Sequence, residues 1–297
     1  MEKTQVGLIK TPNRARGVTR SIGLLNPEGI KGQEVLIKPN FNTADPAPGS
    51  THNDTLRQLI EELKKLGARR LVIGERSYHS TDRVIKEKEV DKMAEELEIE
   101  IMNFDNLSPD DWVEFRPEHS HWKDGFHVAR PILEAETIVS TCCLKTHRHG
   151  GIFTLSLKLS VGIVPIRGYD YMDELHSSPH QRKMIAELNQ AYEPSLIVMD
   201  GVEAFVDGGP DTGARKKAHV MLAGTDRVAM DAVGVAILKE LGSNQDIMKR
   251  EIFSQEQIAR AVEIGIGISS PQQIELLTDD EESKQYAEKI RTILDQG

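Results

Sequence analysis

Hydrophobic residues in this chain form short, β-branched runs that alternate with amphipathic segments. Four of the runs end in a polar residue suited to chemistry: 35–37 lead to Lys38, 71–74 to Glu75, 137–144 to Lys145 and 196–199 to Asp200. If the runs are parallel strands, these side chains lie along one edge of a sheet. Open α/β sheets bind ligands in the crevice beyond that edge. The pattern therefore predicts where a site lies, without naming its substrate.

The clearest structural unit is the stretch from residue 34 to residue 75. An apolar run and a polar loop precede a helical segment whose leucines and isoleucine recur on one face between 56 and 66. Thr51 or Asn53 is predicted to cap the start of this helix and Gly67 its end. The next strand follows at once, which predicts parallel strands joined by a right-handed crossover.

The remainder of the chain continues the alternation of strands and helices. Helices are predicted over 82–97, from Ser178 as N-cap, over 226–241 with Asp226 as N-cap, over 255–264 and over 282–294, and strands over 99–104, 219–223 and 274–277. We therefore predict an α/β fold with a mainly parallel, twisted sheet covered by helices on both faces. Residues 1–297 are interpreted as a single α/β unit, and a division into two lobes near residue 150 stays open.

Charge and hydropathy limit the partners. The 297 residues carry 37 basic and 47 acidic side chains, a formal charge of −10, and repulsion from phosphate backbones argues against nucleic-acid binding. A local basic cleft can still attract small anions. No apolar run reaches the roughly 18 residues of a membrane helix, so we expect a cytoplasmic protein without a membrane partner. The oligomeric state is not predicted.

The chain has two cysteines, Cys142 and Cys143, which are adjacent. Neighbouring side chains on a strand point to opposite faces, so we expect both thiols to be reduced. Two cysteines cannot supply the usual ligands of an iron–sulfur cluster or a structural zinc, so neither is expected. The cofactor is otherwise unknown.

The loop that follows the first of the four strands carries Lys38, Asn40 and Asn42. A lysine beside a strand that is buried on both faces must reach solvent, a carboxylate or a ligand. Two roles remain open for Lys38, a salt bridge to Glu75 and a contact with a bound ligand.

The segment LKTHRHGG, residues 144–151, places Lys145, His147, Arg148 and His149 beside two glycines. Such a cluster suits a phosphate or carboxylate, and two histidines at i and i+2 could instead face one metal ion. A solvated basic loop is the third interpretation.

Other candidates lie later in the chain. His176 and His180 are metal ligands, single proton-transfer groups in a cleft, or surface or packing residues, and Asp231 is a weaker candidate on its helix. The loop with Gly208 and Gly209 either approaches a ligand closely or forms an exposed tight turn.

Taken together, several segments resemble the family called domain of unknown function 362. They are VLIKPNF with Thr51 and His52, IGE at 73–75, LKTH at 144–147, SLKLSVG at 156–162, the Asp200-Gly201 strand end, GGPDTG at 208–213 and AGTDRVAMDAV at 223–233. The resemblance covers about residues 30–240 and implies a prokaryotic, cytosolic α/β protein. Many members carry an appended ferredoxin-like module with iron–sulfur clusters, which the cysteine content of this chain does not support.

A more distant similarity of layout is to the nickel-cofactor lactate racemase group, which places lysines and histidines in a cleft between two α/β lobes. This similarity points to Lys38, His52, Lys145, His147 and Lys158.

The sequence thus predicts an enzyme acting on a small anionic metabolite. Lys38, Asn40, Asn42, Lys145, Lys158, Gly208 and Gly209 would bind it, and His52, His147, Glu75 and Asp200 would serve acid–base roles. One alternative is a metal-dependent enzyme using His147, His149, His176 or His180 with Asp200. The other is a non-catalytic accessory protein of a redox system.

Overall fold

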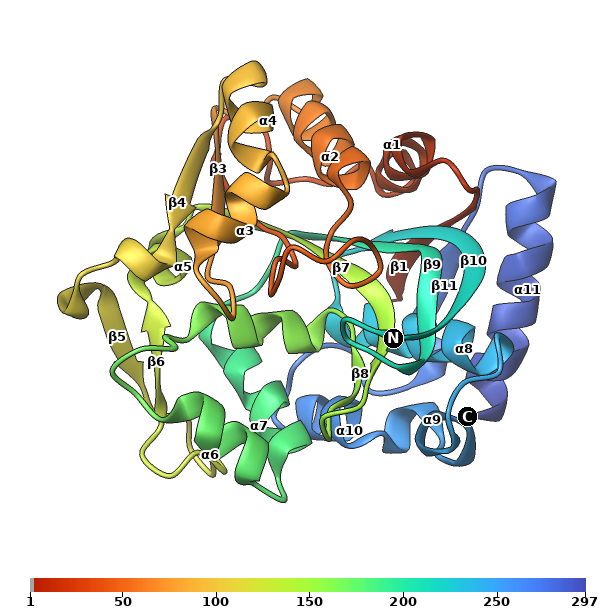
Figure 1. Cartoon of the computed structure of the whole chain (residues 1–297). Coiled ribbons are helices and arrows are strands. Elements are labelled where there is room, and N and C mark those ends of the chain that lie inside the picture. The colour runs from red at the N-terminus through yellow and green to blue at the C-terminus, as the bar shows by residue number, and fades with distance from the viewer. Residues whose placement is uncertain (1–2) are drawn as a thin grey trace.

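Eleven strands form two sheets in the computed structural model, which describes residues 3–297 (Figure 1). The strands are β1 (Thr4–Lys10), β2 (Glu34–Lys38), β3 (Arg70–Glu75), β4 (Glu100–Asn103), β5 (Trp112–Phe115), β6 (Phe126–Ala129), β7 (Thr137–His147), β8 (Ile152–Thr154), β9 (Leu196–Gly208), β10 (Gly213–Gly224) and β11 (Ile274–Leu277). The main sheet has the order β11-β1-β10-β9-β7-β2-β3-β4, and β8 pairs with β7. Strands β5 and β6 form a separate antiparallel hairpin.

The main sheet is mostly parallel, as predicted. Strands β4, β3, β2, β7 and β9 run parallel to one another, so their carboxyl ends meet at one edge. Strand β10 is antiparallel to both of its neighbours, β9 and β1. Within β2, Val35 and Ile37 pack on one face and Leu36 on the other, and all three are buried. A sheet that is covered on both faces requires such continuous apolar strands.

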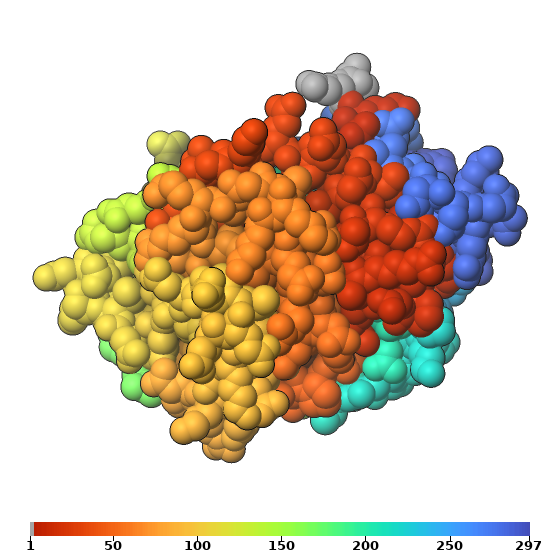
Figure 2. Space-filling view, turned by 90° about the horizontal axis from the view of Figure 1, so that it is seen from above, coloured from red at the N-terminus to blue at the C-terminus, as the bar shows by residue number. Residues whose placement is uncertain are grey.

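Helices cover both faces and give a three-layer architecture. One face is packed by α1 (Arg14–Leu25), α2 (Asn53–Lys65), α3 (Thr81–Glu87) and α4 (Val90–Glu96). The other is packed by α5 (Arg130–Glu134), α6 (Tyr171–Ser177), α7 (Gln181–Glu187), α8 (Arg227–Glu240), α9 (Gln245–Lys249), α10 (Glu256–Glu263) and α11 (Glu281–Gln296). Viewed from above, the surface is dominated by the N-terminal helices, with the blue C-terminal segment at one side (Figure 2).

Several predicted boundaries needed correction. His52, rather than Thr51 or Asn53, caps α2. The helix predicted over 82–97 is two helices, α3 and α4, because Glu89 adopts a left-handed conformation with φ of 54° between them. Ser178 ends α6 and does not start α7, whose N-cap is His180. Asp226 caps α8 as predicted, accepting from Ala229 N at 2.9 Å.

Strands from both sides of residue 150 share the main sheet. Strand β9 pairs with β7, and β10 pairs with β1. Within residues 3–297, none of the helices combines the length and the apolar character that a membrane crossing requires.

Candidate functional site

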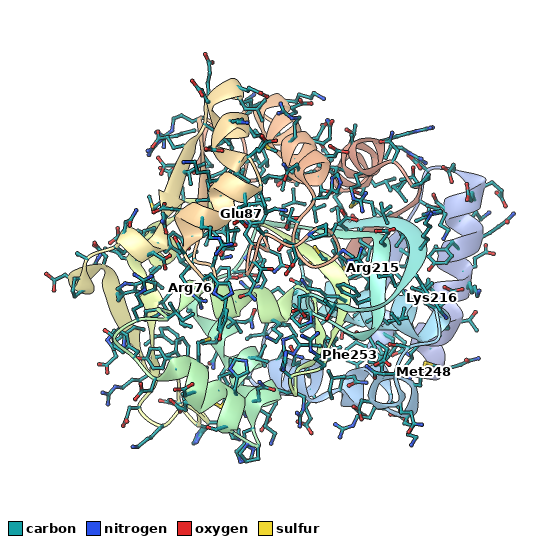
Figure 3. All side chains as sticks on the ribbon, viewed as in Figure 1. Arg76, Glu87, Arg215, Lys216, Met248 and Phe253 are labelled. Carbon is teal, nitrogen blue, oxygen red and sulfur yellow. The ribbon has the colours of Figure 1, made fainter. Side chains whose placement is uncertain are left out.

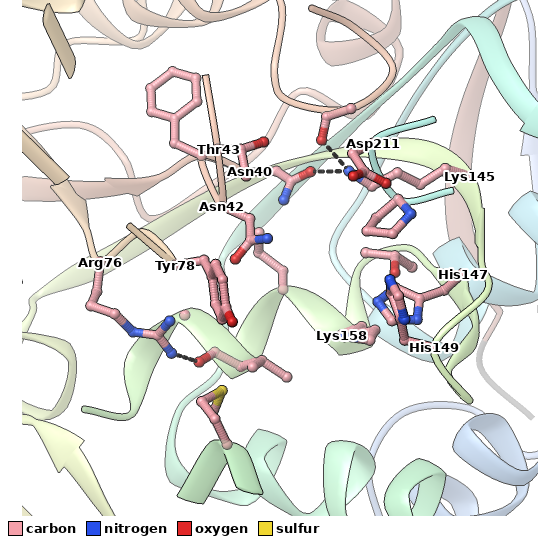
Figure 4. A pocket seen from close by; sticks show the side chains of 18 of the residues that line it. Asn40, Asn42, Thr43, Arg76, Tyr78, Lys145, His147, His149, Lys158 and Asp211 are labelled. Carbon is pink, nitrogen blue, oxygen red and sulfur yellow. Dashed lines mark hydrogen bonds between the residues drawn. The ribbon is translucent and has the colours of Figure 1, made fainter. Parts of the chain in front are cut away.

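A cleft of about 480 Å³ opens at the carboxyl ends of β2, β3 and β7 (Figure 4). Its walls also include the 3₁₀ segment η3 (Leu157–Ile163), α6 and the turn at 210–211. Seven of the residues predicted for the site line it: Lys38, Asn40, Asn42, Glu75, Lys145, His147 and Lys158. The parallel strand order brings them together, because every contributing strand ends at the same edge.

At the floor of the cleft, Lys38 and Glu75 form a buried ion pair. Lys38 Nζ donates to Glu75 Oε1 at 2.5 Å, and both side chains are almost fully buried. The Glu75 carboxylate also accepts from the backbone N–H groups of Phe41 at 3.0 Å and Arg76 at 2.8 Å. Glu75 is therefore saturated by three donors and holds the loop after β2 against β3.

Lys145 reaches the cleft from β7 and secures the opposite side of the same loop. Its ammonium donates to Asn40 Oδ1 at 2.7 Å and to the backbone carbonyl of Gly49. Burial lowers the pKa of Lys145. An ammonium has three donors, so one N–H remains for a ligand.

The segment η3 carries Lys158 and is fixed at both ends. At its start, Asp231 of α8 accepts from Ser156 N at 2.7 Å and from Leu157 N at 3.3 Å. At its end, the buried guanidinium of Arg76, a side chain that is labelled in Figure 3, donates to the carbonyls of Val164 at 2.9 Å and of Val161. These contacts fix the backbone that presents Lys158 to the cleft.

The buried carboxyl of Asp231 is expected to make stability depend on pH. Burial raises its pKa to about 8, against about 3.9 for an unfolded aspartate. The folded state therefore binds more protons between these values, and stability falls as the pH rises from about 4 to about 8. Asp231→Asn lacks this carboxyl, so its stability relative to wild type should increase as the pH rises from about 4 to about 8, measured by urea unfolding of both proteins across that range. A difference that does not change with pH would contradict the buried, protonated carboxyl.

Lys158 is the cationic group of the cleft that lacks a protein partner. Its side chain is 9% exposed, and within residues 3–297 no acceptor lies within hydrogen-bonding distance of Nζ. Burial, with the positive charges of Lys145 and Arg76 nearby, lowers the pKa of Lys158 to about 8. The side chain is therefore largely removed from solvent, while its ammonium at the cleft has no protein acceptor to offset the cost of desolvation.

His147 stands next to Lys158. Its Nδ1 is buried and has no hydrogen-bond partner within residues 3–297, and burial together with Lys158 holds the pKa of the ring well below its usual value. The imidazole is therefore neutral and can accept a proton. The position that a Cβ of Gly151 would occupy lies 2.9 Å from His147 Nδ1 and 3.0 Å from Lys158 Cε. Gly151 keeps the space between the two groups open.

Two of the predicted acid–base residues lie outside the lining of the cleft. Asp200 is in mid-strand, because β9 continues to Gly208, and it shares a face with Val198 and Val202. Its carboxylate accepts from Arg14 Nε and Thr55 Oγ1, each at 2.7 Å, and so links the sheet to α1 and α2. His52 accepts from Asp54 N at 3.1 Å as the cap of α2. Both make structural contacts.

The glycine loop forms the turn of the β9–β10 hairpin. Gly208 and Gly209 have φ values of 78° and 65°, which glycine adopts without strain. A Cβ on Gly209 would lie 2.1 Å from the carbonyl oxygen of Thr146, so the turn packs directly against β7. The next two residues, Pro210 and Asp211, line the cleft in place of the glycines.

Three of the histidines predicted as metal ligands, His147, His149 and His176, line the cleft, and His180 does not. Within residues 3–297, no group of three or more His, Cys, Asp or Glu side chains is arranged to hold a metal ion. His180 packs on His121 with ring centroids 4.6 Å apart, whereas His147 and His149 lie 5.6 Å apart at the cleft. Asp200 is held by Arg14. Cys142 and Cys143 are buried, free thiols, and burial raises the pKa of Cys143 to about 11.

Sequence reasoning missed more than half of the residues that line the cleft. Arg76, Tyr78 and Thr154 line it, as does Gly162, where a Cβ would lie 2.8 Å from Lys38 Nζ. Arg76 follows a strand end directly, a position that could have been recognised. Thr154 could not, because its place depends on its pairing with Lys145 across β7 and β8.

The chain is similar to known proteins. It is 23% identical over 217 residues to the thylakoid-associated protein sll1697 of Synechocystis sp., which covers 70% of this chain and 64% of that protein. The chain thus spans less than two thirds of the length of this relative. A structural match is the lactate racemase apoprotein from Thermoanaerobacterium thermosaccharolyticum, with a TM-score of 0.48, 13% identity, and coverage of 97% of this chain and 86% of the other.

The family assignment predicted from the sequence segments is confirmed. The matching family model is described as a domain of unknown function, and its match, residues 35–236, contains β2, β3, β7, η3 and most of α8. This range covers more than half of the chain and includes all seven predicted residues that line the cleft. The protein therefore belongs to the DUF362 family.

Proposed function

We propose that this protein is an enzyme that acts on a small metabolite bearing a carboxylate or phosphate group, bound in the cleft at the carboxyl ends of β2, β3 and β7. The observation that carries the proposal is Lys158, whose side chain is largely buried in the wall of the cleft and whose ammonium has no acceptor among residues 3–297. Retaining such a charge costs stability, and a bound anion would supply the missing partner.

The charge balance of the cleft supports an anion. Four nearly buried cations line it, namely Lys38, Arg76, Lys145 and Lys158. The lining has three carboxylates: Glu75 neutralises Lys38, Asp211 pairs with Arg148 at 2.7 Å, and Asp173 lies exposed on α6. Lys145 and Lys158 thus face the cleft without a carboxylate partner. A charge-assisted contact to an anion is stronger than a neutral hydrogen bond, especially in a desolvated site.

The neutral His147 favours an enzyme over a passive binding protein. Its unpartnered Nδ1 and the unpartnered hydroxyl of Thr154 are both buried in the wall of the cleft. A neutral imidazole can accept and return a proton when a substrate occupies the site, and the hydroxyl can hydrogen-bond to that substrate. We assign His147 the role of proton acceptor and Lys145 and Lys158 the role of anion ligands.

The experiment is a calorimetric titration with small carboxylates and phosphates. Wild type is compared with Lys158→Met and with a matched control, Lys284→Met, which removes an exposed lysine of α11. The proposal expects at least one anion to bind wild type and the control equally, and Lys158→Met much more weakly. If no anion binds, or if Lys158→Met binds as well as wild type, the proposal is wrong.

Gly151→Ala is expected to block the anion site with little effect on folding. The added Cβ would enter the space between His147 Nδ1 and Lys158 Cε, and Gly151 does not require a positive φ. We expect a loss of anion affinity of about tenfold, since the His147 ring and the end of the Lys158 side chain must move apart to make room for the methyl group. Gly23→Ala in α1, where a Cβ meets no atom within 4 Å, is the control. An unchanged anion affinity in Gly151→Ala would show that the anion does not occupy the space between His147 and Lys158.

A further inference from the structure

We propose that Lys158 is an amine nucleophile that forms a Schiff base with the carbonyl carbon of a 2-oxo acid. The proposal rests on the proposed function and narrows its substrate class from small anions to anions with an adjacent carbonyl group. A carboxylate alone needs only a cation, whereas the structure provides a second feature beside the cation, an unpartnered proton acceptor.

The geometry distinguishes Lys158 from the other lysines of the cleft. Lys38 donates to Glu75 and to the carbonyl of Pro39, and Lys145 donates to Asn40 and Gly49. Either ammonium would have to break these hydrogen bonds and lose a proton before its nitrogen could attack a carbonyl carbon. Lys158 has no such bonds among residues 3–297, and it faces the space beside His147.

The electrostatic setting favours the free amine of Lys158. Lysines become nucleophilic when they are desolvated or stand beside another cation. Both conditions hold, because Lys158 is buried near Lys145 and Arg76. With a pKa of about 8, about a tenth of the side chain is deprotonated at pH 7, a fraction roughly 300-fold larger than that of a surface lysine.

The chemical step is balanced within the cleft. The substrate carboxylate is held by the remaining N–H of Lys145, and the Lys158 amine attacks the carbonyl carbon, forming a C–N bond as the π pair moves to oxygen. His147 Nδ1 takes a proton from nitrogen and returns it to that oxygen. His147 then carries the second proton of the amine to the same oxygen. The C–O bond breaks, water leaves with both protons of the amine, and the C=N bond forms. No oxidant or reductant is required.

The test is reductive trapping with sodium cyanoborohydride. Wild type is incubated separately with glyoxylate, pyruvate and 2-oxoglutarate, and with lactate as an anion without a carbonyl, and is then analysed by intact-mass and peptide mass spectrometry. We expect a single adduct with the mass of the oxo acid less one oxygen, located on Lys158. Lys158→Met should form no such adduct in the time that wild type needs to form it, and Lys284→Met should be labelled as wild type is.

The pH dependence provides an internal check. Trapping at Lys158 should accelerate up to about pH 8 and then level off, whereas labelling of a surface lysine continues to rise towards pH 10. Binding of lactate to the same samples, followed by a thermal shift, reports the proposed function separately. Lactate binding without any adduct from the three oxo acids would overturn the Schiff base alone. Absence of both binding and adducts would overturn the inference together with the proposed function.

Discussion

Lys158→Met is expected to raise the stability of the protein at pH 7 while lowering its affinity for anions by tenfold to hundredfold. Burial lowers the pKa of Lys158 to about 8, so the folded state retains a charge that it hydrates poorly. Methionine has a similar length and no charge, and the expected gain is about 1–3 kcal/mol in unfolding free energy. The loss of affinity follows from the lost charge-assisted contact, worth about 1.5–3 kcal/mol.

The sign of the stability effect can be checked against pH. Because the pKa is lower in the folded state, the penalty is fully present below about pH 8. It is relieved as the pH rises towards the unfolded value of about 10.4. The advantage of Lys158→Met in urea unfolding should therefore shrink between these limits. A variant that is less stable than wild type at pH 7 would show that Lys158 has a stabilising partner.

Glu75→Ala should be among the most destabilising single substitutions in the site. It leaves the Lys38 ammonium buried without its partner, and it also orphans the N–H groups of Phe41 and Arg76. Breaking a buried ion pair from one side typically costs about 3–5 kcal/mol. Chemical denaturation of the variant should show a loss of that size.

The double variant Lys38→Met with Glu75→Gln is the matched control. It removes both charges and keeps an acceptor oxygen for one of the two N–H groups, so it should recover part of the lost stability. A Glu75→Ala variant within about 1 kcal/mol of wild type would indicate that this ion pair contributes little, as exposed pairs do. Because Glu75 is held in this ion pair, we propose the acid–base role for His147 and not for Glu75.

The sequence predicted the position of the cleft because strand ends in a parallel sheet share one edge. Lys38, Glu75 and Lys145 were found in this way, since each follows or ends an apolar run. The same rule failed for Asp200. Strand β9 continues for eight residues beyond it to pair with β10, and no local pattern showed that this run was only half of a longer strand.

The chemistry of the cleft depends on contacts between distant segments, which periodicity cannot show. The start of η3 is held by Asp231, which is 75 residues away from Ser156 in the chain, and its end by Arg76. Lys158 was predicted as an anion ligand, but its lack of a partner became visible only in three dimensions. Gly151 likewise has a clear role only because His147 and Lys158 flank it.

Proton uptake on anion binding tests the central claim most directly. At pH 8 about half of the Lys158 side chains are deprotonated, and a bound anion favours the ammonium form. Titrating lactate, which does not itself titrate near pH 8, in buffers of different ionisation enthalpy gives the number of protons bound. We predict an uptake of roughly half a proton per bound anion in wild type and none in Lys158→Met. Binding without proton uptake in wild type would contradict an anion site built on Lys158.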